Sequence, residues 1–132
     1  SVCRMPQSVS LPVRSVADPG PRGPDADLAE DAHQLTKKFP KEELFNLTSQ
    51  FNRASDSIAL NISEGSIGQS DPEQSKFIGY SIRSTAECIT CIYKARTRKY
   101  ISEEEFSSFY NKAEVLVKKT TSFRKGLLQR RF

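Results

Sequence analysis

Three long segments of the chain repeat apolar residues at every third or fourth position, and this helical period constrains the fold more than any other feature. The segments are residues 41–64, 70–99 and the stretch from 102 onward, and a shorter one spans 25–38. No stretch of similar length alternates apolar and polar residues as a half-buried strand does. The sequence therefore predicts an all-α fold, an antiparallel bundle of four helices.

Local signals give the predicted helices their ends. Pro40 stops the first helix, because the residue before a proline is pushed out of the helical region. Gly65 is expected to end the second helix in the left-handed conformation. Asp71 is expected to cap the third helix, with Pro72 at the first helical position, where no hydrogen bond is lost.

The fourth helix has the clearest start. Ser102 is typical of an N-cap, and Glu105 three residues later completes a capping box. Ile101 and Phe106 stand at the positions of a hydrophobic staple. We therefore expect the fourth helix to begin directly after Ser102.

The predicted core takes one apolar stripe from each helix. The stripes are Leu28, Ala32, Leu35 and Phe39 in the first; Leu44, Leu47, Phe51, Ala54, Ile58 and Ile62 in the second; Phe77, Ile78, Ile82, Thr85, Cys88, Ile89, Ile92 and Tyr93 in the third; and Phe106, Phe109, Tyr110, Ala113, Leu116, Val117, Thr120, Phe123 and Leu127 in the fourth. Phe45, Leu60 and Val115 lie off these stripes. Such residues stabilise a small bundle by facing a neighbouring subunit.

The first 24 residues differ in composition from the rest. They hold five of the seven prolines, which predicts a disordered, Pro-rich N-terminal leader, 1–24, before a bundle domain at 25–130. The leader is either a native tail or an expression or start-site artefact. No segment approaches the roughly 20 apolar residues of a membrane span, and no signal-peptide core is present. We expect a soluble, cytoplasmic protein with no membrane partner.

Positive charge is concentrated in the predicted bundle. The whole chain has a formal net charge of +4, but residues 35–132 carry seventeen Lys and Arg against eleven Asp and Glu. This surplus favours RNA, DNA or an acidic protein face as partner, and it is also an ordinary solubility charge. The three cysteines form no disulfide framework and fit a reducing cytosol.

Basic residues near two helix ends are the candidate nucleic-acid-binding sites. They are Lys94, Arg96, Arg98 and Lys99 in the third helix, and Lys118, Lys119, Arg124, Lys125, Arg130 and Arg131 in the fourth. They could grip phosphates, with Tyr93 and Tyr100 stacking on exposed bases. Alternatively, they are solvated and complement the helix dipoles. The two groups lie at opposite poles of an antiparallel bundle, so only a ring of subunits would multiply either one.

No group of residues fits catalysis, a metal or a cofactor. Cys88 and Cys91 spell C-x-x-C deep inside a helix, where we expect them to pack as apolar residues. His33, the one histidine, lacks a nucleophile and an acid partner. Asn61 and Glu64 either contact a ligand or subunit, or Asn61 fixes the helix register. We therefore expect no enzymatic activity, no cofactor and no small-molecule substrate.

Several short segments between Leu35 and Leu127 resemble a known family in their order and spacing. They are Leu35–Glu43, Leu47–Gln50, Arg53–Ala54, Ser57–Ile58, Asn61–Ile62, Glu64–Gly65 and Tyr100–Ser102. The chain is similar to the four helix bundle protein family, also called S23 ribosomal or 23S rRNA intervening-sequence proteins of bacteria. Two departures are a short opening, Asp25–Leu28, and Ala59 where the family usually has a proline that kinks the helix.

The resemblance implies an up-and-down, left-handed bundle that assembles as a ring, commonly a pentamer, without established enzymatic activity. A relative of this fold serves diversity-generating retroelements, where a basic pentamer is similar to a platform for RNA and reverse transcriptase. Together with the charge, this predicts a non-enzymatic, homo-oligomeric binding or scaffold protein, with RNA or a ribonucleoprotein as partner. The alternative is a purely structural protein–protein interaction module without nucleic-acid binding.

Overall fold

The computed structural model describes residues 24–67 and 70–129, and within them the predicted all-α fold is confirmed. The elements are α1 (Pro24–Thr36), a 3₁₀ turn η1 (Lys41–Glu43), α2 (Leu47–Gly65), α3 (Asp71–Thr97) and α4 (Glu103–Gln129). The predicted leader, apart from Pro24, lies outside the described residues, as do Arg130 and Arg131.

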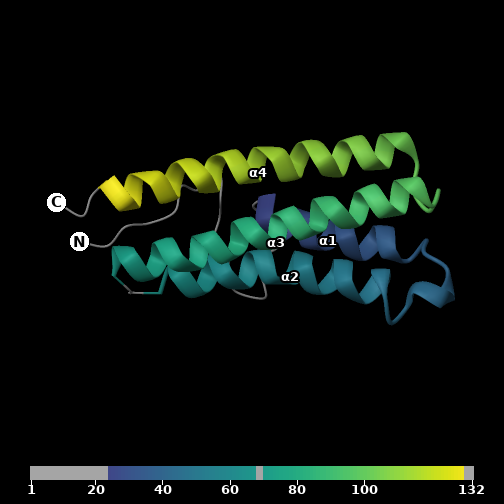
Figure 1. Ribbon diagram of the computed structural model, residues 1–132, viewed down its shortest axis with the longest axis horizontal. Coiled ribbons are helices and arrows are strands. Elements are labelled where there is room, and N and C mark those ends of the chain that lie inside the picture. The colour runs from purple at the N-terminus through teal and green to yellow at the C-terminus, as the bar shows by residue number, and fades with distance from the viewer. Residues whose placement is uncertain (1–23, 68–69, 130–132) are drawn as a thin grey trace, which may run out of the picture.

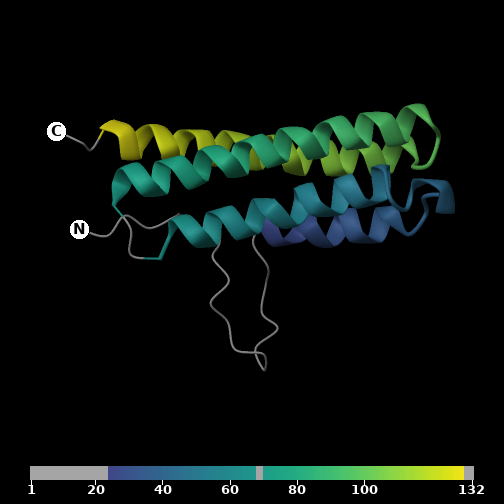
Figure 2. The same cartoon turned by 60° about the horizontal axis from the view of Figure 1, so that its bottom comes forward.

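The four helices run alternately in opposite directions along the bundle (Figure 1). Each helix packs on the next one in the chain, and α1 closes the bundle against α4. Figure 2 shows the result as two helix pairs, α1 with α2 along one side and α3 with α4 along the other. The α2–α3 contact is the most extensive, and the α1–α4 contact is the least extensive of the four.

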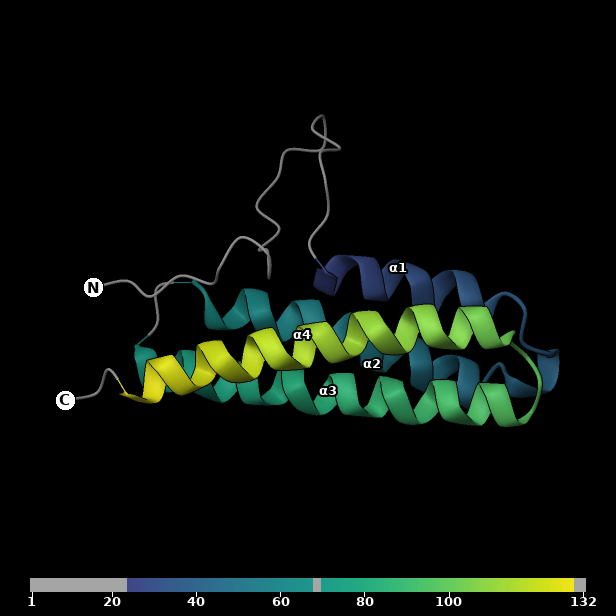
Figure 3. The same ribbon diagram turned by 90° about the horizontal axis from the view of Figure 1, so that it is seen from above.

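Helix α1 covers only part of the bundle. It has 13 residues, whereas α3 and α4 have 27 each. Seen from above, α1 lies beside the first half of α4 and ends short of its second half (Figure 3). The second half of α4 is therefore held mainly by α3.

The predicted stripes supply most of the core. Phe51 and Phe109 are fully buried at its centre, with ring centroids 5.2 Å apart in an edge-to-face contact. Phe39 stacks on Phe51 at 6.3 Å. Two assignments are wrong: Leu44 is exposed, and the Tyr93 side chain is 42% exposed.

Leu44 is exposed because the helix predicted over 41–64 is interrupted. Residues 41–43 form a 3₁₀ turn, and α2 begins only at Leu47. The Glu43 carboxylate accepts a hydrogen bond from Asn46 Nδ2 at 3.1 Å and a longer one from the Leu47 amide at 3.4 Å. This carboxylate accepts from an amide of the first turn of α2 that has no partner inside the helix. Residues 44–46, between the 3₁₀ turn and α2, are exposed.

Gly65 does not have the left-handed role that was predicted for it. It is the last residue of α2, and an added Cβ would lie 3.0 Å from Phe77 Cβ and 3.4 Å from the Gln74 carbonyl oxygen. A glycine is needed here because α2 and α3 approach so closely. The left-handed residue is Lys99, with φ of 63°, where amide-to-carbonyl bonds from Lys99 to Arg96 and from Tyr100 to Ala95 end α3.

The starts of α3 and α4 show one correction and one confirmation. Ser70, not Asp71, caps α3, because its hydroxyl accepts a hydrogen bond from the Glu73 amide. The capping box of α4 is confirmed: the Ser102 amide donates to Glu105 Oε1 at 2.8 Å, and the Glu105 amide donates to Ser102 Oγ at 3.0 Å. Helix α4 therefore begins directly after Ser102, as the sequence predicts.

Small polar side chains join α2 to α3. The hydroxyls of Ser57 and Ser84 lie 2.8 Å apart, and the Ser81 hydroxyl donates to the Ile58 carbonyl at 3.1 Å. Asn61 Nδ2 donates to the carbonyl and hydroxyl oxygens of Ser57 at 2.8 and 2.9 Å. Asn61 thus bonds within α2, to the serine whose hydroxyl meets Ser84 of α3.

Gln74 gives a test of this packing. Its side chain is 1% exposed, and its Nε2 has no hydrogen-bond partner in the part of the chain that the structure describes. An unsatisfied buried donor costs about 1–3 kcal/mol. Gln74→Met should therefore raise the free energy of unfolding by about 1 kcal/mol, measured by urea denaturation. The exposed Gln129→Met is the control, and a less stable Gln74→Met protein would contradict the assignment.

Candidate nucleic-acid interface

The two basic groups lie at opposite poles of the bundle, as the antiparallel arrangement requires. The end of α3 adjoins the start of α4 at one pole, and the end of α4 adjoins the start of α3 at the other (Figure 1). A single subunit therefore does not combine them into one patch. The contacts of each basic group within its own pole determine which of its cations are exposed to a ligand.

The arginines at the end of α3 are engaged within the fold. Arg98 Nη1 lies 3.0 Å from Glu43 Oε2 in an ion pair. The Arg96 guanidinium lies over the Phe106 ring, 4.0 Å from its centroid, and 5.1 Å from the centroid of Tyr93. Both side chains connect α3 to neighbouring elements. Arg98 is nevertheless exposed, as are Lys94 and Lys99.

Glu43 is the centre of the polar contacts at this pole. Its Oε2 accepts a hydrogen bond from the Tyr100 hydroxyl at 2.8 Å as well as the bond from Arg98. The Tyr100 hydrogen bond is the largest cause that lowers the pKa of Glu43, and the same bond raises the pKa of Tyr100. The Tyr100 ring also contacts Phe39, with centroids 5.3 Å apart. Tyr100 is thus committed to the fold, contrary to the stacking role considered for it.

The lowered pKa of Glu43 predicts an acid-sensitive contribution to stability. Because the folded-state pKa lies below the ordinary 4.5, ionised Glu43 stabilises the fold above that pH, and the contribution is lost as pH falls below it. Glu43→Gln should therefore be less stable than wild type near neutral pH, and the difference should shrink toward about pH 3. Urea unfolding across this range measures it.

The exposed neighbour provides the control for this titration. Glu42→Gln removes the same charge one residue away and should leave the stability profile close to wild type. A wild-type minus Glu43→Gln difference that stays constant from neutral to acidic pH would contradict the role of the ionised carboxylate.

At the opposite pole, Arg124 is held against α3. Its Nε donates to the carbonyl and hydroxyl oxygens of Ser75 at 3.1 and 3.2 Å. The guanidinium lies on Gly79, where an added Cβ would be 3.0 Å from Nη2 and 3.1 Å from Cζ. Lys118 and Lys125 are exposed nearby on α4, and Lys119 is half-buried.

Arg124 lines a depression of about 260 Å³ between α3 and α4. We call this depression the α3–α4 basic depression. Its lining residues are Pro72, Ser75, Lys76, Gly79, Tyr80, Arg83 and Arg124. Three of the seven are cationic and none is acidic. Lys76, Tyr80 and Arg83 were missed in the sequence analysis, although their spacing of four and three places them on one stripe of a helix.

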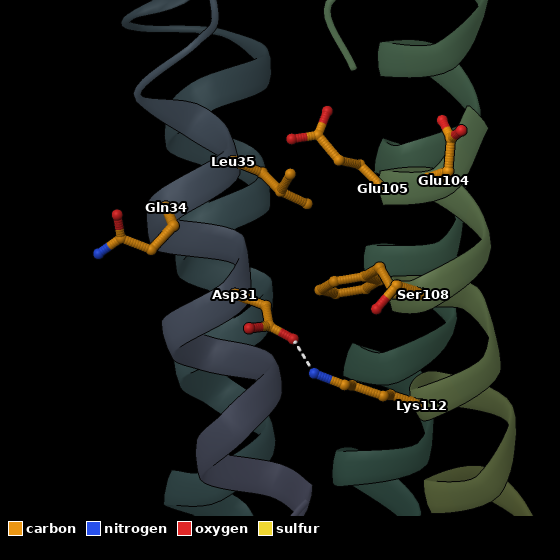
Figure 4. Close-up of a pocket in the computed structure, with 8 residues that line it drawn as sticks. Asp31, Gln34, Leu35, Glu104, Glu105, Ser108 and Lys112 are labelled. Atoms are coloured by element: carbon orange, nitrogen blue, oxygen red, sulfur yellow. Dashed lines mark hydrogen bonds and ion pairs between the residues drawn. The ribbon is translucent and has the colours of Figure 1, made fainter. Parts of the chain in front are cut away.

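A second concavity lies between α1 and α4 and has a different character. This groove of about 290 Å³ is lined by Asp31, Gln34, Leu35, Glu104, Glu105, Ser108, Phe109 and Lys112. Figure 4 shows Lys112 reaching across it to Asp31, with Nζ and Oδ2 2.7 Å apart. Glu105 pairs with Lys38, and this hydrogen bond is the main cause that lowers its pKa. Three carboxylates against one lysine make the groove unsuited to a polyanion.

A family comparison covers most of the helical part of the chain. A family model described as 23S rRNA-intervening sequence protein matches residues 25–122. The chain belongs to this family. The match begins in α1 and extends into α4, so it includes the lining of both concavities except Arg124. No curated protein matches the chain.

The chain keeps the bundle despite its two departures from the family pattern. Its α2 runs without interruption through Ala59, and its short α1 still buries Leu28 and Leu35 in the core. Within the described residues, no helix combines the length and the apolar character needed to cross a membrane.

The thiols and the histidine of this family member show no sign of reactive chemistry. Cys88 and Cys91 are fully buried, and burial raises the pKa of both thiols, that of Cys91 to about 11. Both are therefore protonated at neutral pH, which suits packing. His33 is exposed on α1. Among the described residues, no three His, Cys, Asp or Glu side chains gather as metal ligands.

Proposed function

We propose that this member of the family is a non-enzymatic, homo-oligomeric scaffold that binds RNA or a ribonucleoprotein through the basic surface of α3 and α4. The observation that carries the proposal is the α3–α4 basic depression, a concave site with three cations and no carboxylate in its lining. Phosphate neutralisation supplies most of the affinity of non-specific nucleic-acid binding. The family description, which names an rRNA intervening sequence, supports the same class of partner.

The surroundings of the depression extend its positive charge. Lys125 follows Arg124 on the part of α4 that packs beside the start of α3, and Lys118 and Lys119 lie nearer the middle of α4. Several cations at one pole favour a chain of phosphates over a single small anion. The arginines at the other pole, Arg96 and Arg98, are engaged with neighbouring side chains and contribute less to this surface.

Exposed apolar side chains support the homo-oligomer. Phe45 is 93% exposed and Leu60 is 68% exposed, and Val115 is also exposed, so these residues do not join the core of the single chain. Large exposed apolar residues often mark protein–protein contacts. Packing between subunits would bury them and would multiply the basic surface around a ring, which the family resemblance implies to be a pentamer.

The RNA-binding proposal predicts a salt-dependent interaction. Wild-type protein should retain a short single-stranded RNA in fluorescence anisotropy at low salt. The affinity of Lys118→Ala/Lys125→Ala should fall, and the slope of log K against log salt should flatten by about 1.4 if each lysine neutralises one phosphate. Lys37→Ala/Lys41→Ala removes the same charge from exposed positions near α1 and η1 and is the control.

The purely structural alternative gives the opposite result in the same experiment. The observation that favours this alternative is that three arginines make contacts within the bundle, namely Arg96, Arg98 and Arg124. Absence of RNA retention even at low salt, where phosphate binding is strongest, would overturn the RNA proposal. A protein that still formed its oligomer would then act through protein–protein contacts.

The oligomer proposal predicts a mass above that of the single chain. Light scattering at micromolar concentration should return a multiple of 14.8 kDa, fivefold for a pentamer. Leu60→Glu should lower the mass toward that of the monomer, because it places a charge in an apolar contact. Ala86→Glu, which introduces the same charge at an exposed position of α3, is the control. A monomer mass for wild type would contradict the proposal.

A further inference from the structure

We propose that the α3–α4 basic depression is a site for one phosphate group, with the Arg124 guanidinium as its fixed anchor and Lys76 and Arg83 closing on the anion. The inference rests on the proposed function in that RNA is the expected source of the phosphate. A free phosphorylated ligand offers the same chemistry. The site differs from a diffuse positive surface because its cations converge on one concavity of about 260 Å³.

Arg124 is held in place before any anion binds. Its Nε donates to both the carbonyl and the hydroxyl of Ser75, which fixes the guanidinium plane relative to α3. These bonds use Nε, and the terminal nitrogens Nη1 and Nη2 extend across Gly79. A guanidinium fixed in this way pairs with phosphate oxygens at a smaller entropic cost than a free side chain would.

Gly79 provides the space that this geometry requires. Glycine destabilises the middle of a helix relative to alanine, so its presence inside α3 calls for a local reason. Here an added Cβ would lie 3.0 Å from Nη2 and 3.1 Å from Cζ of Arg124. That distance is too short for an unshifted guanidinium. The missing side chain therefore permits the position of the anchor.

Two exposed cations of α3 flank the anchor, which belongs to α4. Lys76 and Arg83 stand three residues before and four residues after Gly79, on the lining of the depression. The Arg83 guanidinium carbon lies 5.8 Å from the centroid of the Tyr80 ring, a cation–π contact. No carboxylate of the described residues forms an ion pair with Lys76, Arg83 or Arg124.

The first turn of α3 brings a helix dipole and two carboxylates close to the depression. Pro72, in the first turn of α3, forms part of the lining, so the positive end of the α3 dipole lies beside the depression. The acidic residues of that turn, Asp71 and Glu73, are not part of the lining. Charge-assisted hydrogen bonds from a guanidinium and an ammonium to an anionic phosphate are the strong interactions that this arrangement favours.

The first test uses inorganic phosphate alone. Amide chemical shifts are followed by NMR while phosphate replaces chloride at constant ionic strength, so that screening does not change. We expect saturable shifts centred on residues 75–83. Gly79→Ala keeps every charge and should weaken phosphate binding about ten-fold, because it displaces the Arg124 anchor. Urea unfolding checks that this variant keeps its fold, because alanine favours helix whereas a displaced Arg124 would weaken its bonds to Ser75.

Two further variants distinguish phosphate binding at this site from non-specific attraction to positive charge. Arg83→Ala should also weaken phosphate binding about ten-fold, whereas Lys37→Ala, on the far side of the bundle, should bind as wild type does. Shifts that do not saturate, or equal affinity in wild type and Gly79→Ala, would overturn the proposal.

A competition arm identifies the source of the phosphate. If a short RNA without terminal phosphates displaces inorganic phosphate from residues 75–83, the site binds an RNA backbone. If phosphate saturates the site and the RNA does not compete, the ligand is a free phosphorylated molecule. RNA retention that is unchanged in Gly79→Ala and Arg83→Ala would leave the proposed function standing and remove this site. Saturable phosphate binding without any RNA retention would support this site and overturn the proposed RNA binding.

Discussion

Helices α2 and α3 approach each other across a line of small residues, and the rest of the bundle is arranged on this contact. Gly65 lies against Phe77, and serine hydroxyls bond across the interface and to the opposite backbone. Because Ser84 of α3 bonds to α2, the rotation of α3 about its own axis is fixed. In this orientation Ser75 and Gly79 face Arg124 of α4. The close α2–α3 contact thus determines which residues of α3 face α4.

The short α1 gives the two halves of α4 different surroundings. Its first half is enclosed by α1 and α3, with Phe109 in the core and Lys112 bridging to Asp31. Its second half depends on α3, and the bonds from Arg124 to Ser75 tie the two helices there. The same side chain therefore stabilises the end of α4 and provides the anchor of the proposed phosphate site.

Much of the fold could be predicted from the sequence because its signals are local. The capping box at Ser102 and the apolar helical stripes depend on residues a few positions apart, and both are confirmed apart from Leu44 and Tyr93 in the stripes. The roles of Gly65 and Tyr100 could not be predicted, because they depend on Phe77 and Glu43, which are distant in the sequence. For the same reason, the candidate site was predicted only in part: helix-end charges named Arg124 but missed its neighbours across the α3–α4 contact.

Hydrogen–deuterium exchange with and without a short single-stranded RNA tests the central claim most directly, because it locates a ligand without any substitution. The account predicts that RNA slows exchange in the first three turns of α3 and in the second half of α4, around Ser75 and Arg124, and leaves the groove between α1 and α4 unchanged. Protection confined to that acidic groove, or no protection at low salt, would contradict it.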